Sequence, residues 1–216
     1  MNKILFIDTL TTGINTERCA IYRIGGIFCE ESANTMKEVR RFDLAVRPFE
    51  GARIIENSLW VGGVTRGLLA GYPAQDKAFA DFFALIDERI NVKNVKDKLY
   101  ICGFNVSSFD APFLKNWFTR NGNGRYRDCF FVQTIDLMSI AAFAMMNFRE
   151  DMPDFHLETA AKVLGVSPTK GEHYCCLDNA ETCVKMYIEL KRRLSSGAPE
   201  GWSPLERVFS NLPIKI

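Results

Sequence analysis

The chain opens on a stretch that joins an apolar run, one carboxylate and a polar turn. Residues 4–7 are apolar, Asp8 follows them, and threonines lead on to Gly13. A short apolar run bounded by a turn is typical of a buried strand. We therefore expect a strand that carries Asp8 out of the sheet at its end, where a carboxylate can bind a metal ion.

Two further segments alternate apolar residues with others at the period of a strand. They span residues 20–28 and 42–46, and Pro48 ends the second. Short polar turns join the three segments, which predicts an antiparallel meander. Residues 50–71 are rich in glycine, so we expect an irregular surface connection there.

The rest of the chain alternates helical and strand patterns. Helices are expected near residues 79–90, 109–117, 140–146 and 180–194, and strands over 99–102 and 130–132, the second ending near Asp136. Asp154 is expected to cap a helix that runs through Leu164 and stops at Gly165. Strands followed by alternating strands and helices indicate a mixed sheet with helices packed on it.

The composition predicts one domain in a reducing compartment. The 216 residues are 47% apolar with a net charge of +1, which suits a single core and requires any nucleic-acid surface to be local. No run is long enough to span a membrane and no signal-peptide cleavage site follows the first strand, so we expect a soluble, cytoplasmic protein. The seven cysteines form no CxxC pair, which argues against zinc and favours buried free thiols. A redox role for Cys175 and Cys176 is the alternative.

Three aspartates stand where strands or helices begin or end. They are Asp8, Asp110 and Asp178, and His173 lies in the loop before the last of them. Divalent cations such as Mg²⁺ take oxygen ligands, phosphoryl transfer often uses two such ions, and a histidine can accept the proton of an attacking water. Each aspartate alone is more often a helix cap or a turn residue, so composition by itself does not predict that the three carboxylates meet in space.

The motifs of the chain resemble those of the DEDDh, or DnaQ-like, 3′–5′ exonucleases, which include the proofreading subunit of bacterial DNA polymerase III. The resemblance covers about residues 3–190 in the order of the family. The matching segments are Phe6–Gly13 (F-x-D-x-E-T-T-G), Ile24-Gly25 (IG), Gly63–Thr65 (GIT), Asn105 with Phe109-Asp110 (N-x-x-F-D, one residue longer here), Leu157–Gly165 (LE…LAK…LG) and His173 with Asp178 (H-x(4)-D).

This resemblance implies an α/β chain with the RNase H-like fold, a five-stranded mixed β-sheet flanked by α-helices. It implies one exonuclease-like domain over residues 1–216, with a C-terminal tail from residue 195. It also implies two Mg²⁺ or Mn²⁺ ions and the 3′ end of single-stranded DNA or RNA as substrate, and it leaves a DNA polymerase or a second copy of the chain open as partner. The implied metal ligands are Asp8, Asp110 and Asp178, the implied general base is His173, and the implied substrate-binding residues are Thr9, Leu10, Trp60, Thr65, Asn105 and Phe109.

The chain departs from the family at position 10, where leucine replaces the glutamate of the first motif. Leucine cannot bind a cation, so the resemblance no longer guarantees the second ion. No motif places Glu17 or Glu30 as a substitute. Two interpretations follow: a weakened nuclease, and a catalytically silent module that keeps the fold and binds nucleic acid or a protein. The presence of His173 favours the weakened nuclease.

Basic and aromatic residues also gather after Asp110. Such a mixture can bind a single strand, with cations along the backbone and rings stacked on bases. The alternative, which we favour, is a solvated helix face with Trp117 in the core. The residues are Lys115, Trp117, Arg120, Arg125, Tyr126 and Arg127.

Overall fold

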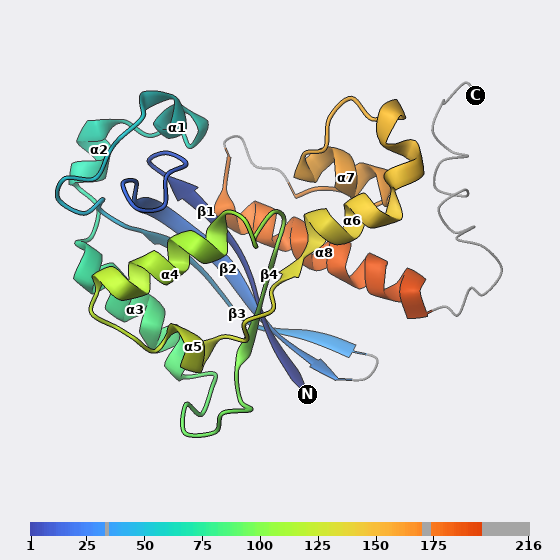
Figure 1. Cartoon of the computed structure of the whole chain (residues 1–216), viewed down its shortest axis with the longest axis horizontal. Helices are drawn as coiled ribbons and strands as arrows, with labels where there is room; N and C mark the ends of the chain where they lie inside the picture. Colours follow the sequence, from blue (N-terminus) through green and yellow to red (C-terminus); the bar gives the residue numbers. More distant parts are fainter. Residues whose placement is uncertain (33–34, 170–173, 196–216) are drawn as a thin grey trace.

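The chain is built around a five-stranded mixed sheet in the order β3-β2-β1-β4-β5. The structure is a computed structural model that describes residues 1–32, 35–169 and 174–195. β1, β2 and β3 form an antiparallel meander, and β4 and β5 continue the sheet in parallel on the other side of β1 (Figure 1). The strands are β1 (Asn2–Thr11), β2 (Ile21–Ser32), β3 (Thr35–Ala45), β4 (Leu99–Gly103) and β5 (Ile135–Asp136). The mixed sheet and the meander are therefore confirmed.

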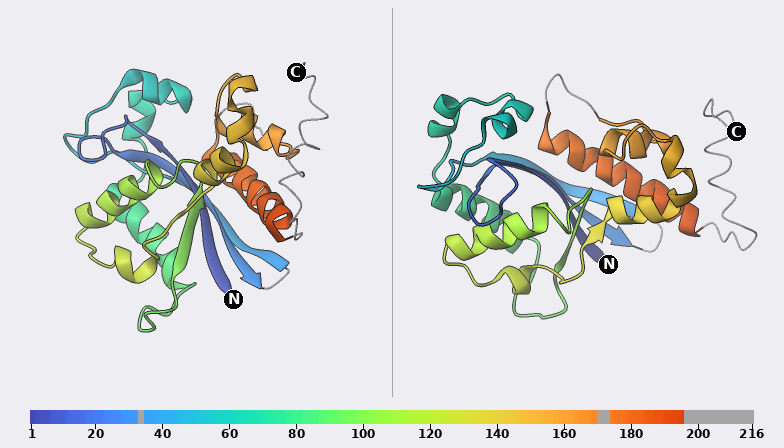
Figure 2. Two further views of the ribbon diagram at one scale, coloured as in Figure 1. Left: turned by 45° about the vertical axis from the view of Figure 1, so that its right-hand side comes forward. Right: turned by 45° about the horizontal axis from the view of Figure 1, so that its top comes forward.

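Helices cover both faces of this sheet. α3, α4 and α5 lie on one side, α6, α7 and α8 lie on the other, and α1 and α2 stand beside the carboxyl end of β1 (Figures 1 and 2). The helices are α1 (Glu56–Val61), α2 (Arg66–Ala70), α3 (Gln75–Asp87), α4 (Asp110–Arg120), α5 (Tyr126–Cys129), α6 (Leu137–Ala144), the 3₁₀ helix η1 (Met146–Asp151), α7 (Leu157–Val163) and α8 (Cys176–Ser195). Across the described ranges, no helix combines the length and apolar character needed to cross a bilayer.

The pleat of β1 decides which helices each of its side chains meets. Successive residues of a strand point to opposite faces of the sheet. Leu5 and Ile7 belong to the core beneath α3 and α4, whereas Ile4 and Phe6 belong to the core beneath α6, α7 and α8. The same alternation sends Asp8 towards α8 and Thr9 towards α4, which sets the geometry of the site described below.

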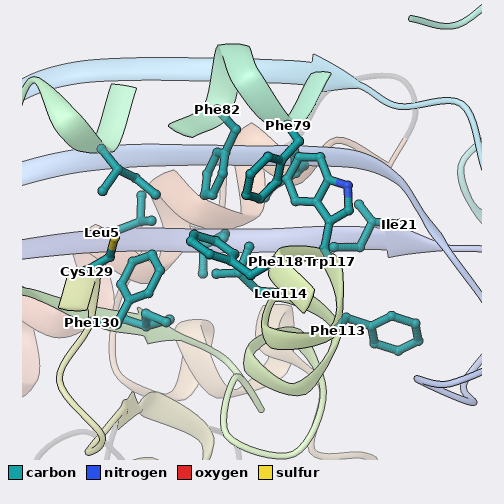
Figure 3. Close-up of a cluster of buried hydrophobic side chains, with 14 of the residues drawn as sticks. Leu5, Ile21, Phe79, Phe82, Phe113, Leu114, Trp117, Phe118, Cys129 and Phe130 are labelled. Carbon is teal, nitrogen blue, oxygen red and sulfur yellow. The ribbon is translucent and has the colours of Figure 1, made fainter. Parts of the chain in front are cut away.

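An aromatic layer fills the core on the α3–α4 face (Figure 3). The Trp117 ring is 2% exposed and lies edge-on to Phe79, with ring centroids 5.3 Å apart. Phe118 also meets Phe79 edge-on at 5.0 Å. The core position predicted for Trp117 is thus confirmed, and this ring is not available for stacking on a base.

The connection over residues 50–71 is more regular than predicted. It contains the two short helices α1 and α2. The Oγ1 of Thr65 accepts a hydrogen bond from the backbone N–H of Leu68 and so caps α2. Helices this short depend on packing rather than on propensity, and here Leu59 and Leu69 are buried in the core.

Two other predicted elements are shifted along the chain. Phe130 forms only an isolated bridge with Leu99, and Phe131 stacks on Tyr100 at 4.4 Å, so the pairing with β4 is interrupted until β5. The strand predicted over residues 130–132 is therefore wrong. Asp154 accepts a hydrogen bond from the N–H of His156 instead of capping a helix, since α7 begins later, at Leu157.

The cysteines are free thiols, as predicted. All seven are unpaired, and every one except Cys175 is buried. Burial raises the pKa of Cys102 and Cys183 well above the usual value, which keeps both thiols protonated. These two side chains behave as small apolar core residues.

Candidate active site

Asp8 lies within β1, not at its end. It pairs with Gly25 of β2, and the strand continues through Thr11. The hydroxyl of Tyr174 donates to the Asp8 carboxylate at 3.4 and 3.5 Å. Burial raises the pKa of Asp8 to about 7, against hydrogen bonds from Cys176, Asn179 and Tyr174 that favour the charged form. The carboxylate is thus strongly sensitive to any cation placed beside it.

Asp110 is the first residue of α4 and is 3% exposed. The Oγ1 of Thr9 donates to its Oδ1 at 2.6 Å, which ties the start of α4 to β1. Burial, and then the charge of Asp8, raise the pKa of Asp110 well above the usual value. A buried carboxyl whose ionisation is opposed by a neighbouring carboxylate is a setting in which a bound cation can replace a proton.

A cleft of about 690 Å³ opens beside Asp8. Asp178 at the start of α8, Asn105 after β4 and Asp8 itself share this cleft, whereas Asp110 does not line it. Further lining residues come from the segment that leads into α7 and from the first turn of that helix. The lining residues are Asp8, Phe104, Asn105, Met138, Asp154, Phe155, His156, Leu157, Glu158, Thr159, Thr169, Tyr174, Cys175, Asp178 and Asn179.

Two glycines allow the close approach of the elements that carry these acids. A Cβ on Gly25 would lie 2.6 Å from the backbone nitrogen of Leu177, so only glycine lets the start of α8 rest on β2. A Cβ on Gly103 would lie 2.7 Å from the carbonyl oxygen of Ile7, next to Asp8. Glycine is used here because the backbones come too near for any side chain.

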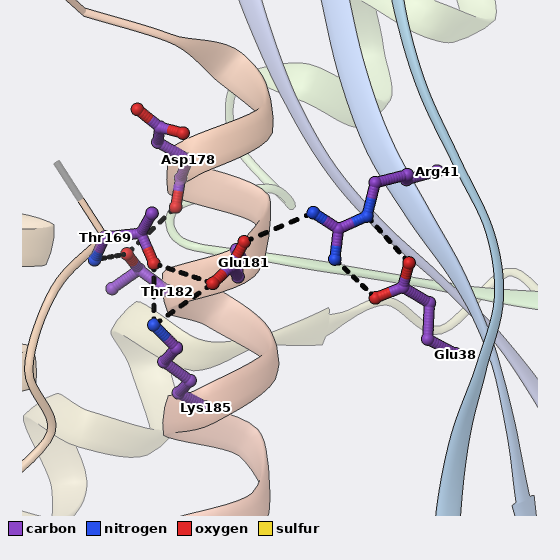
Figure 4. Close-up of polar contacts among 7 residues, drawn as sticks. All are labelled: Glu38, Arg41, Thr169, Asp178, Glu181, Thr182 and Lys185. Atoms are coloured by element: carbon purple, nitrogen blue, oxygen red, sulfur yellow. Dashed lines mark hydrogen bonds and ion pairs between the residues drawn. The ribbon is translucent and has the colours of Figure 1, made fainter. Parts of the chain in front are cut away.

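A polar network holds the first turns of α8 in place (Figure 4). The Oγ1 of Thr182 donates to the carbonyl oxygen of Asp178 at 2.9 Å and accepts from the N–H of Thr169 at 2.9 Å. Lys185 donates to Thr169 at 2.7 Å, and Glu181 pairs with Arg41 of β3 at 3.4 Å. Figure 4 shows the carboxylate of Asp178 turned away from these contacts.

Comparison with known proteins identifies the family of this chain. The sequence profile of RNase T, described as an exonuclease family, matches residues 5–187. The chain belongs to the RNase T family of exonucleases. No curated protein matches it at a significant level.

Solved structures of exonuclease I share the fold of this family member. E. coli exonuclease I in complex with a dT13 oligonucleotide is 18% identical with a TM-score of 0.68, over 91% of this chain and 43% of that one. The zinc-bound E. coli exonuclease I–ssDNA complex is 17% identical with a TM-score of 0.68, over 89% and 41%. The chain therefore spans less than half the length of these proteins, and the likeness confirms the RNase H-like fold.

Leu10 departs from the exonuclease motif in structure as well as in sequence. It is 5% exposed and lies on the same face of β1 as Asp8. Its apolar neighbours are Tyr22, Leu59, Val64, Leu69 and Cys176. The side of Asp8 where the family motif carries a second acid is thus packed with apolar groups, and Leu10 belongs to a core cluster and not to the lining of the cleft.

The described residues meet the metal requirement of such a site only in part. Asp8 and Asp110 supply two adjacent carboxylates, and Asp178 faces the same cleft as Asp8. Over residues 1–32, 35–169 and 174–195, no three His, Cys, Asp or Glu side chains come together as one group of metal ligands. Asp110 is buried against Thr9 and does not line the cleft that Asp8 and Asp178 share.

The remaining predicted residues are dispersed. Trp60 is 84% exposed on α1 and Thr65 caps α2, and neither lines the cleft of Asp8. Thr9 is buried against Asp110, and Phe109 packs on Phe113 with ring centroids 5.2 Å apart. The predicted general base, His173, lies outside the described residues.

Other residues of the site were not predicted. Tyr174 and Asn179 contact Asp8, and both are close in sequence to Asp178, so proximity to the third motif was the available signal. His156 lines the cleft, with Nδ1 3.4 Å from Asp154. The sequence marked Asp136 only as the end of an expected strand.

Proposed function

We propose that this chain is a divalent-metal-dependent 3′–5′ exonuclease that acts on single-stranded nucleic acid and turns over slowly. The observation that carries the proposal is the buried pair formed by Asp8, which lines a cleft of about 690 Å³, and Asp110, whose pKa is raised by burial and by the charge of Asp8. Membership of the RNase T family supports hydrolysis as the reaction.

Phosphodiester hydrolysis assigns separate tasks to these groups. A water oxygen forms a bond to phosphorus, the bond from phosphorus to the 3′ oxygen of the preceding nucleotide breaks, and that oxygen takes up a proton. The products are a nucleoside 5′-monophosphate and a strand one nucleotide shorter. A divalent ion, when bound, offsets the negative charge that builds up on the phosphate oxygens. Asp8, Asp110 and Asp178 would hold it, and His173 would accept the proton of the water.

The single-strand preference rests on the surroundings of the cleft. Asn105 lines the cleft with an amide that can donate to a phosphate or a base. Trp60 presents an exposed ring on α1, beside the carboxyl end of β1, on which a terminal base can stack (Figure 1). The oligonucleotides in the exonuclease I structures belong to those proteins, and they support the same substrate class for this chain.

The slow turnover follows from Leu10. Its side chain adds no charge to offset a cation, and its apolar neighbours exclude water from that side of Asp8. The same observation favours a second candidate function, a catalytically silent module that binds single strands or a protein. Hydrolysis and binding without hydrolysis are therefore the two outcomes to separate.

The test uses DNA and RNA oligonucleotides labelled at the 5′ end, with a free or a phosphate-blocked 3′ end. The proposal predicts that Mg²⁺ or Mn²⁺ produces a ladder of shortened, 5′-labelled products from free 3′ ends. A silent module instead shifts the oligonucleotide in a binding gel and leaves its length unchanged in both metals. Release of the 5′ label as a mononucleotide at the earliest times would contradict the proposed direction.

A further inference from the structure

The carboxylate of Asp136 accepts hydrogen bonds from two segments of the chain, the turn after β4 and the start of α6. It closes β5 and is 8% exposed. Its Oδ1 accepts from the N–H groups of Asn105 at 3.1 Å and Met138 at 3.0 Å, and its Oδ2 accepts from the N–H of Ser107 at 2.9 Å. A weaker bond comes from the N–H of Ser139 at 3.4 Å. A buried carboxylate satisfied by backbone donors is rigidly oriented and orients those donors in return.

One of the two segments is the turn that leads from β4 into Asp110. Asn105 has a φ of 64°, in the left-handed region that non-glycine residues adopt only when their surroundings hold them there. The turn closes on itself through the N–H of Phe109, which donates to the carbonyl oxygen of Asn105 at 3.1 Å. The Oγ atoms of Ser107 and Thr134 lie 2.6 Å apart, which fixes the outer side of the turn.

The position of this turn matters because it carries two residues of the site. Asn105 lines the cleft, and Asp110 begins α4 beside Asp8. The far end of the turn, at Asp110, is held by a hydrogen bond from Thr9 of β1. Near Asn105, two sets of contacts join the turn to the corner between β5 and α6. They are the hydrogen bonds accepted by Asp136 and the contact of Ser107 with Thr134.

We infer that Asp136 is a positioning residue of the active site, which fixes Asn105 and the approach to Asp110 by accepting the N–H groups of Asn105 and Ser107. Its capping of α6 is a separate task performed by the same carboxylate. The effect of Asp136 on turnover rests on the proposed exonuclease function, whereas its effect on the turn does not.

Two substitutions separate these tasks. Asp136→Ser keeps a good helix cap for α6, but its hydroxyl is too short to reach the turn. Asp136→Asn keeps an oxygen for Asn105 and Met138 and replaces Oδ2 by an amide that cannot accept from Ser107. Asn94→Ala, which removes the side-chain acceptor of the Lys96 N–H in the turn before β4, is the matched control for the loss of a side-chain to backbone hydrogen bond elsewhere in the chain.

Amide hydrogen exchange of the full chain measures how well the backbone amides of the turn are protected, and it does not require enzymatic activity. We expect Asp136→Ser to speed exchange at Asn105 and Ser107 by about tenfold or more while α6 stays protected. Asp136→Asn should speed exchange mainly at Ser107, and Asn94→Ala should leave both amides unchanged. Amides that exchange freely in the wild-type chain, or that stay equally protected in Asp136→Ser, would overturn the inference.

Measurements of kcat then test the effect of Asp136 on the active site. In a chain that degrades oligonucleotides, Asp136→Ser should lower kcat by about tenfold or more, Asp136→Asn should lower it less, and Asn94→Ala should not lower it. An unchanged kcat in Asp136→Ser, with a loosened turn, would overturn the positioning role. If the wild-type chain degrades nothing, the proposed function fails, and the exchange comparison still decides whether Asp136 orders the turn.

Discussion

The hydroxyl of Thr9 donates a hydrogen bond of 2.6 Å to the buried carboxylate of Asp110. These residues come from β1 and α4, far apart in sequence, and their contact follows from the pleat of one strand. Asp8 faces α8, so its neighbour Thr9 faces α4, where Asp110 begins the helix. One strand thus supplies a carboxylate to the cleft and a partner to the second carboxylate.

Thr9→Val should destabilise the fold by about 1–3 kcal/mol, because it leaves the Asp110 carboxyl buried without its side-chain donor. Valine keeps nearly the same shape, so the loss reports the hydrogen bond. Urea denaturation measures the free energy of unfolding. Thr9→Ser, which retains the hydroxyl, should keep most of the stability, and equal losses in the two variants would show that the methyl group matters instead.

Leu10→Glu should behave differently with and without a divalent cation. In EDTA the new carboxylate is buried among apolar side chains, so we expect a loss of about 2 kcal/mol or more. Mn²⁺ should restore much of that loss if the site can hold the ion near Asp8. Thermal unfolding in EDTA and in Mn²⁺ measures both effects.

Leu10→Gln is the matched control for this variant, with the same shape and no charge. It should lose stability in EDTA and gain little from Mn²⁺. An identical response of the Glu and Gln variants to Mn²⁺ would show that position 10 does not face the cation. A gain of nuclease activity in the Glu variant alone would show that the missing acid limits turnover.

The free energy of unfolding of the metal-free protein should fall as the pH rises towards 7. Burial raises the pKa of Asp8 to about 7, so the folded chain keeps a proton that the unfolded chain releases near pH 4. Folding is therefore favoured on the acid side of this window and loses that contribution above it. Asp8→Asn, which carries no titrating proton, should show a flatter dependence between about pH 4 and about pH 7. A parallel dependence in both proteins would contradict this assignment.

Gly25→Ala should disturb the start of α8. The added Cβ would meet backbone atoms of Cys176 and Leu177 at 2.8 and 2.6 Å, and backbone cannot move aside as a side chain can. We expect a cost of about 1–3 kcal/mol, measured by thermal unfolding. Gly124→Ala is the matched control, because a Cβ there meets nothing within 4 Å. Equal stability of the two variants would show that α8 does not rest on β2 as described.

The elements with a clear period were predictable from the sequence. The first three strands, α3 and α8 carry apolar residues at regular spacing, and each forms where that spacing predicts. α1 and α2 were missed because they are short, glycines follow each of them, and their stability comes from burial of Leu59 and Leu69. The strand expected at residues 130–132 was wrong because those aromatic residues pack on β4 and do not pair along it.

The site was predictable only where a motif marks it. Asp8 and Asp178 share a cleft, whereas Asp110 is buried outside its lining and close enough to Asp8 to respond to its charge. The contacts of Asp136 with the Asn105 turn could not be predicted, because they depend on how the chain returns through β5 to the end of β4. The packing of Leu10 likewise depends on α1, α2 and α8 meeting at one point.

The most direct test of the account is single-turnover degradation of a 5′-labelled single strand by excess protein in Mn²⁺, compared between the wild type and Asp110→Asn. This substitution removes a charge from the buried pair and keeps the size of the side chain, so thermal unfolding of both proteins serves as the control for folding. We predict slow shortening from the 3′ end by the wild type and none by Asp110→Asn. A wild type that shortens nothing, or that is indistinguishable from Asp110→Asn, would contradict the central claim that Asp8 and Asp110 form a working nuclease site.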